Sequence, residues 1–149
     1  MENLLKFYIN GEWVAPLSDA TMPVLNPATE KQIGTVALGN EADVDRAVAA
    51  ASTAFEEFSQ TSKDERLALL HKVRAITEAR MEELAQAMRM EMGAPITMSR
   101  DVQADAAVGH LDGFITALEE LEERLKLANG DIMVREPIGV CGLITPWNF

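Results

Sequence analysis

Apolar side chains recur every three or four residues through the middle of the chain, a spacing that predicts amphipathic helices. We expect helices near 41–59, 63–92 and 99–126. The side chains expected to face inward are Val44, Val48, Ala51, Phe55 and Phe58 in the first, Leu67, Leu70, Val73, Ile76, Leu84, Met88 and Met92 in the second, and Val102, Ala106, Phe114, Leu118, Leu121 and Leu125 in the third.

Polar residues mark where these helices begin and end. Asn40 is a good N-cap, and two acidic residues follow it within three positions, where they suit the positive end of the helix dipole. Ser62-Lys63-Asp64-Glu65 has the form of a capping box. Gly93 suits a left-handed cap, and Pro95 prevents simple continuation of the helix.

The first forty residues have the pattern of strands and turns instead. Asn10-Gly11 separates two short apolar runs, and this pair accepts positive φ at both positions of a two-residue hairpin. A second pair of runs flanks the turn-rich connector Asn26 to Glu30. We therefore expect two hairpins within residues 7–36, packed beside a larger body.

The end of the chain has a third pattern. Ile132 to Glu136 is expected to be extended, and Ile138 to Thr145 is apolar on both faces, as in a strand buried within a parallel sheet. Residues that follow such a strand lie where α/β sheets bind ligands. A doubly buried strand needs neighbours that 149 residues do not supply, and an exposed apolar edge would aggregate. We therefore expect the folding unit to continue past residue 149.

Charge and composition exclude several classes of protein. Thirteen basic against 24 acidic residues give a net charge of −11, which disfavours nucleic acid and anionic lipid as partners. No apolar run approaches the roughly 18 residues of a membrane helix, and no secretory signal is visible at the N-terminus. A single cysteine fits a reducing compartment. These features indicate an acidic cytoplasmic protein without nucleic-acid or membrane partners.

Few side chains suggest chemistry by themselves. His71 and His110 each lack a second ligand at a suitable spacing, so we expect no metal site. Cys141 lies inside the expected strand with no base nearby, and we interpret it as a buried structural cysteine. Gly139 and Gly142 do not have the spacing of a dinucleotide-binding fingerprint.

The segment Arg135 to Phe149, with the sequence REPIGVCGLITPWNF, closely resembles a signature of the aldehyde dehydrogenase family. Weaker matches occur in the same order along the chain. They are the hairpin Phe7 to Val14, Asn26-Pro27-Ala28-Thr29, Glu65-Arg66, Arg80 to Leu84 and Glu91 to Pro95. Members of that family are several times longer, so the resemblance covers this whole chain but only part of the family's fold.

The resemblance implies an α/β fold that forms the N-terminal part of a Rossmann-like cofactor-binding domain, with N-terminal β-hairpins, long helices and the first core strand. Residues 1–118 would belong to that domain. Residues 119–137 would be a helix end and an extended bridging segment for oligomerisation, and 138–149 the first strand and the loop after it. The partners implied are a small-molecule aldehyde and further copies of the chain, in a dimer or tetramer.

The resemblance also implies an activity, which is oxidation of an aldehyde to a carboxylic acid with NAD or NADP via a thiohemiacetal. Ile144, Thr145, Pro146 and Trp147 would line the adenosine–ribose end of the cofactor. Asn148 would hold the carbonyl oxygen of the substrate, and Phe149 would lie near the substrate tunnel. The nucleophilic cysteine and general-base glutamate of the family lie beyond this segment, so residues 1–149 alone should be inactive.

Two other interpretations come from different classes of protein. In the first, the chain is a non-enzymatic truncated protein that pairs through the extended segment Ile132 to Glu136. In the second, it is a helical interaction module that uses the Val44 and Leu67 stripes, although that interpretation leaves the terminal apolar run unexplained.

Overall fold

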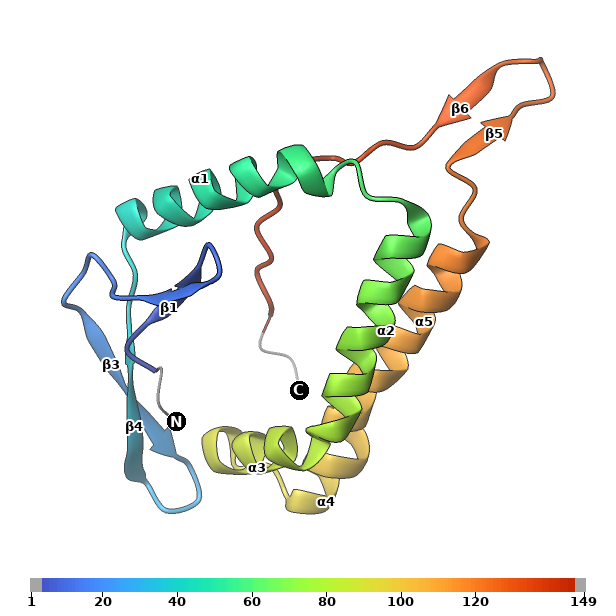
Figure 1. The fold of residues 1–149 in the computed structure, drawn as a ribbon. Helices are drawn as coiled ribbons and strands as arrows, with labels where there is room; N and C mark the ends of the chain where they lie inside the picture. Colours follow the sequence, from blue (N-terminus) through green and yellow to red (C-terminus); the bar gives the residue numbers. More distant parts are fainter. Residues whose placement is uncertain (1–3, 147–149) are drawn as a thin grey trace.

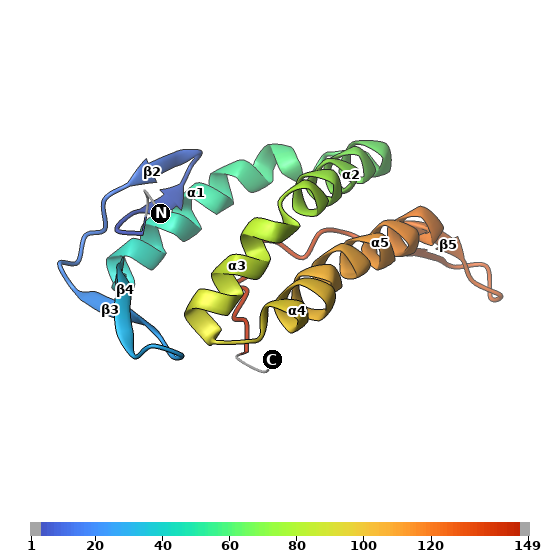
Figure 2. The same cartoon turned by 90° about the horizontal axis from the view of Figure 1, so that it is seen from below.

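The computed structural model describes residues 4–146 (Figure 1). Three separate two-stranded antiparallel sheets and a series of helices make up a mixed α/β arrangement. Figure 1 shows α1, the N-terminal hairpins, α3 and α2 arranged around the last described segment. Figure 2, at right angles, shows α2 and α5 lying side by side.

The N-terminal hairpins form as predicted. β1 (Phe7–Ile9) pairs with β2 (Glu12–Val14), and the turn residues Asn10 and Gly11 have φ values of 54° and 80°. β3 (Thr21–Asn26) pairs with β4 (Lys31–Ala37) around the second turn. In each hairpin, the two apolar runs are therefore joined by the turn that the sequence indicated.

Helix α1 (Glu41–Phe58) begins as its polar residues predicted. The side chain of Asn40 accepts a hydrogen bond from the backbone N–H of Asp43 at 3.1 Å, and the Asp43 carboxylate accepts one from the N–H of Asn40 at 3.2 Å. Asp43 is only 4% exposed and also accepts a 2.9 Å hydrogen bond from the N–H of Leu17. This carboxylate thus joins the helix to the segment after the first hairpin.

The expected helix over 63–92 is wrong as a single element. α2 (Lys63–Ala79) ends at Arg80, whose φ and ψ of −111° and 14° leave the helical region, and α3 (Met81–Met92) begins beyond it. The change of direction lets α3 pack against the helical residues 99–104 and against β3, so tertiary packing overrides the continuous apolar pattern. The predicted capping box at Ser62 and left-handed Gly93 (φ 74°) are both confirmed.

The third helical region is also divided. α4 (Ile96–Met98) leads into a π-helical stretch, η1 (Ser99–Ala104), and then into α5 (Asp105–Glu120). The predicted end at Lys126 is wrong, because the chain becomes extended at Leu121 and forms β5 (Arg124–Lys126). β5 pairs with β6 (Ile132–Val134), where the sequence had indicated extended chain. This hairpin projects away from the helices (Figure 1).

The predicted strand over 138–145 is wrong in this structure. Residues 135–146 have no regular secondary structure, and Ile138 and Ile144 are 93% and 95% exposed. A strand exists only through hydrogen bonds to a neighbour, and no described residue pairs with this segment. For the same reason the expectation of a buried Cys141 is wrong, since its side chain is exposed.

The buried core is small and lies where α3, η1 and α5 meet. Its apolar members are Ala85, Ala104, Val108 and Ile115. Several side chains expected to face inward are instead exposed. In α1, α2 and α3 no described element packs closely enough to bury them. In the third region η1 interrupts the regular α-helical spacing, and Leu125 lies beyond α5 in the projecting strand β5. These residues are Val44, Val48, Ala51, Phe58, Val73, Ile76, Leu84, Val102, Phe114 and Leu125.

Candidate functional site

The predicted binding segment lies at the end of the described chain. Ile144, Thr145 and Pro146 are all exposed, and they follow the irregular segment that replaces the expected strand. In Figure 1 this segment runs past α1 and enters the region between α1, α2 and α3. Trp147, Asn148 and Phe149 lie outside the described residues, so the predicted oxyanion donor and substrate contact have no described geometry.

The polar groups of this segment are available to a ligand. Neither the peptide groups of Ile144 nor the hydroxyl of Thr145 makes a hydrogen bond to another residue within 4–146. A hydroxyl can donate and accept, and a peptide carbonyl can accept, so both suit the hydroxyls of a ribose. Within residues 4–146 these polar groups are therefore not used in contacts with the rest of the chain.

Cys141 lies within the described part of this segment and carries a thiol. Its Sγ donates a weak hydrogen bond to the carbonyl of Gly139 at 3.6 Å, two residues earlier on the same segment. No described histidine or carboxylate contacts the thiol. The geometry therefore provides no general base that would make Cys141 a catalytic nucleophile.

An open apolar groove of about 690 Å³ lies between the first hairpin and α1. Phe7, Tyr8 and Trp13 line it from the hairpin side, and Val44 and Ala47 line it from α1. The carboxylate of Asp43 also borders the groove, but it is engaged by Leu17 and Asn40. The groove can contact apolar surface, and Lys6 also lines it.

Two of the charged pairs that the sequence analysis missed change the pKa of a carboxyl group. Arg100 donates to Glu82 at 2.8 Å, and its hydrogen bonds lower the pKa of that carboxyl from 4.5 to about 2. Arg74 donates to Asp112 at 2.6 Å and lowers the pKa of that carboxyl as well. The partners are 18 and 38 residues apart, so no local spacing could have indicated the pairs. Both pairs join helices on the surface.

Metal ligands are not clustered in the described chain. Within residues 4–146, no group of three or more histidine, cysteine, aspartate or glutamate side chains could hold an ion. None of the described helices is both long and apolar enough to cross a membrane.

Sequence comparison assigns the chain to a family. The family model for the aldehyde dehydrogenase family matches residues 13–149. A putative aldehyde dehydrogenase from Staphylococcus aureus (strain bovine RF122 / ET3-1) is 48% identical over 100% of this chain, which corresponds to 31% of that relative's length. The chain therefore belongs to the aldehyde dehydrogenase family. It spans about a third of the length of the curated relatives that it matches.

Solved structures agree with this assignment. The chain is similar to a mutant of aldehyde dehydrogenase C from Pseudomonas syringae, solved in complex with NAD+ and octanal, with a TM-score of 0.93 and 45% identity. That match covers 97% of this chain and 30% of the other. An aldehyde dehydrogenase from Bartonella henselae matches with a TM-score of 0.84 and 37% identity, over 88% of this chain and 28% of the other.

Proposed function

We propose that these residues form the N-terminal part of a cytoplasmic enzyme that oxidises an aldehyde to a carboxylic acid with NAD+ or NADP+. The observation that supports this most is the similarity of nearly the whole chain, at a TM-score of 0.93, to an aldehyde dehydrogenase solved with NAD+ and octanal. In the proposed division, residues 1–118 belong to a Rossmann-like cofactor-binding domain, 119–137 bridge between subunits, and 138–149 become its first strand and loop.

The proposed cofactor site uses Ile144, Thr145, Pro146 and Trp147. The free peptide groups of Ile144 and the free hydroxyl of Thr145 support this assignment, because they can bind the hydroxyls of the adenosine ribose. Bound nicotinamide dinucleotide supplies an acceptor for the hydride that the substrate loses. The residues of this chain hold and orient that group.

Asn148 is proposed to bind the carbonyl oxygen of the aldehyde, with Phe149 beside it in the substrate path. An amide N–H carries no net charge, so it tolerates a neutral carbonyl and binds more strongly when the oxygen becomes anionic. A donor that strengthens in this way stabilises the transition state of nucleophilic attack more than the bound substrate.

The test is Asn148→Ala in the protein of native length. We expect the pre-steady-state burst of NADH to slow by about two to three orders of magnitude, the effect of losing one oxyanion donor. Affinity for the cofactor should change little, because residues 144–147 are unaltered. Asn148→Asp should be at least as damaging, since a carboxylate repels a developing oxyanion.

The melting temperature of both variants provides the control. If Asn148 only caps a turn, Asn148→Ala will lower the melting temperature and leave the burst rate of the remaining folded protein unchanged. A normal burst rate in Asn148→Ala would therefore remove Asn148 from the proposed mechanism.

A second proposal concerns assembly. We infer that the chain forms a dimer or tetramer through the arm, by which we mean the β5–β6 hairpin with its turn, residues 124–134. No other strand within residues 4–146 pairs with the outer edges of β5 and β6, and exposed Leu125, Ile132 and Val134 lie along the arm. Free strand edges with apolar side chains favour pairing with another chain. A non-enzymatic protein that acts only through such pairing remains the alternative, and it predicts assembly without NADH production at native length.

A further inference from the structure

The arm is joined to the helical body through a short segment, residues 121–123, which follows the end of α5. Leu121 leaves the helix with extended backbone angles (φ −66°, ψ 120°), so this is where the direction of the arm changes. The strands of the arm pack on each other and make no extensive contact with any other described element. The contacts of this joint therefore decide where the arm points.

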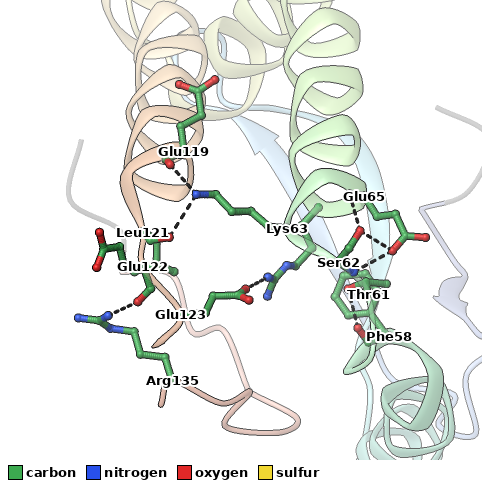
Figure 3. A network of polar contacts seen from close by, with 11 residues as sticks. Phe58, Thr61, Ser62, Lys63, Glu65, Glu119, Leu121, Glu122, Glu123 and Arg135 are labelled. Carbon is green, nitrogen blue, oxygen red and sulfur yellow. Dashed lines mark hydrogen bonds and ion pairs between the residues drawn. The ribbon is translucent and has the colours of Figure 1, made fainter. Parts of the chain in front are cut away.

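Two cations from the first turn of α2, Lys63 and Arg66, contact the joint. Figure 3 shows the contacts of Lys63. The ammonium of Lys63 donates to the backbone carbonyl of Glu119 and, at 3.2 Å, to that of Leu121. The guanidinium of Arg66 forms an ion pair with the carboxylate of Glu123. The acceptors are 56 to 58 residues away in sequence from these donors, so the contacts tie α2 directly to the base of the arm.

A third cation joins the two chain segments at the base of the arm. The guanidinium of Arg135 donates to the carbonyl of Glu122, and its backbone N–H donates to the carbonyl of Glu123 at 2.9 Å. The two ends of the arm are therefore held together by Arg135, whereas the arm as a whole is held to the body by Lys63 and Arg66.

The position of Lys63 and Arg66 is unfavourable for their own helix. Cations at a helix N-terminus oppose the helix dipole, and α2 already has Ser62 and Glu65 as its capping pair. The end of α5 is the complementary case, because its last turn contains no basic residue while its final carbonyls carry partial negative charge. The favourable contacts of Lys63 and Arg66 are therefore with the end of α5 and with the joint beyond it.

We propose that Lys63 and Arg66 are positioning residues that fix the direction of the arm relative to α2, and that a second copy of this chain docks on the arm only when it is held in that direction. The second half of this statement rests on the proposed assembly. The first half depends only on the contacts at the joint.

The test measures arm direction and assembly separately in the protein of native length. Nitroxide-bearing amino acids replace Ala75, on the exposed face of α2, and Ala128, in the turn of the arm. Labelled chains are mixed with excess unlabelled chains, so that the electron–electron distance within one chain is read. The variants are Lys63→Met, Arg66→Met and the double variant. The matched control is Lys72→Met, because Lys72 is exposed on α2 and has no described partner.

We expect the distance distribution to be narrow in the wild type and in Lys72→Met, and to broaden in the double variant. Sedimentation should show the dissociation constant of the assembly rising about tenfold in the double variant, which corresponds to about 1.4 kcal/mol. Arg66→Glu should broaden the distribution, and adding Glu123→Arg should narrow it again by restoring an ion pair. The melting temperature should stay near that of the wild type, because the variants relieve a conflict with the dipole of α2.

The outcomes separate the two proposals. An unchanged, narrow distribution in the double variant overturns the positioning role, even if the protein assembles normally. A wild type that stays monomeric at all concentrations overturns the assembly proposal, and the distances still decide the positioning role. Broadening without any change in the dissociation constant shows that assembly does not depend on arm direction, which overturns the second half of the inference.

Discussion

The helices of residues 41–120 and the segment of residues 135–146 both carry many apolar side chains, yet only the helices have regular structure. A helix satisfies most of its backbone hydrogen bonds within itself, so α1 forms although Val44 and Val48 are exposed. A strand satisfies its bonds only with a neighbour. Apolar content is thus sufficient for a helix with good caps, and insufficient for an isolated strand.

The prediction with the largest expected effect asks whether the irregular structure of residues 135–146 prevents activity. We expect purified protein consisting only of residues 1–149 to produce no NADH from aldehydes. The proposed cofactor segment has no neighbouring strand among the described residues, and the nucleophile that the family resemblance implies lies outside residues 1–149. Absorbance at the NADH wavelength, with mass-verified protein, is the measurement. Steady NADH production would show that the irregular segment of residues 135–146 is sufficient for a working site, and would contradict the comparison.

A second prediction concerns the buried carboxylate that joins α1 to the hairpins. Asp43→Ala removes the acceptor for the N–H groups of Leu17 and Asn40, and we expect it to lower the free energy of unfolding by about 3 kcal/mol. Urea unfolding of the native-length protein provides the measurement. Asp43→Asn keeps one acceptor oxygen and should cost less. Equal stability of Asp43→Ala and the wild type would mean that these bonds do not hold the hairpins to α1.

A third prediction compares two glycines with opposite roles. Gly93 has a φ of 74°, and a Cβ built there would lie 2.6 Å from Cγ of Pro27, so we expect Gly93→Ala to cost about 2 kcal/mol. Gly113, inside α5, has nothing within 4 Å of an added Cβ. Gly113→Ala should therefore stabilise the protein by up to about 1 kcal/mol. If Gly93→Ala did not lower the melting temperature, the αL conformation of Gly93 would not require glycine.

The smallest expected effect concerns pH. Because Arg100 lowers the pKa of Glu82 from 4.5 to about 2, the pair stabilises the folded state above pH 4.5, and this contribution is lost as the pH falls toward about 2. Arg100→Met should remove this part of the pH dependence. Urea unfolding between these pH values measures it. Lys72→Met is the control, since Lys72 has no described partner, and an identical pH profile in both variants would contradict the prediction.

Most of the element boundaries that the structure confirms were predicted from turn residues and helix-capping residues. Asn10-Gly11, Asn40, Ser62 and Gly93 each act through the backbone angles or caps of their immediate neighbours. Such effects depend on a few adjacent residues, and a sequence displays them directly.

The features that were mispredicted depend on residues distant in sequence. The break at Arg80 has no glycine or proline, and follows from the packing of α3 on η1 and β3. The early end of α5 accompanies the contacts of Lys63 and Arg66 with the joint. For the site, family resemblance predicts roles for residues 144–149. The strand expected over 138–145 needs a neighbour, and no described residue pairs with it.

The π-helical stretch η1 changes which residues along the sequence share one face of the helix. Each residue of an α-helix advances by about 100°, and a π turn holds one residue more than an α turn. The expected inward stripe through Val102, Ala106 and Phe114 continues the phase of buried Ser99, yet Phe114 is 65% exposed and the next residue, Ile115, is buried. Deleting one residue between 99 and 104 would allow this stretch to become regular α-helix and would leave Ile115 facing the core. The π stretch therefore lets the chain carry one additional residue without turning the buried face of α5 away from the core.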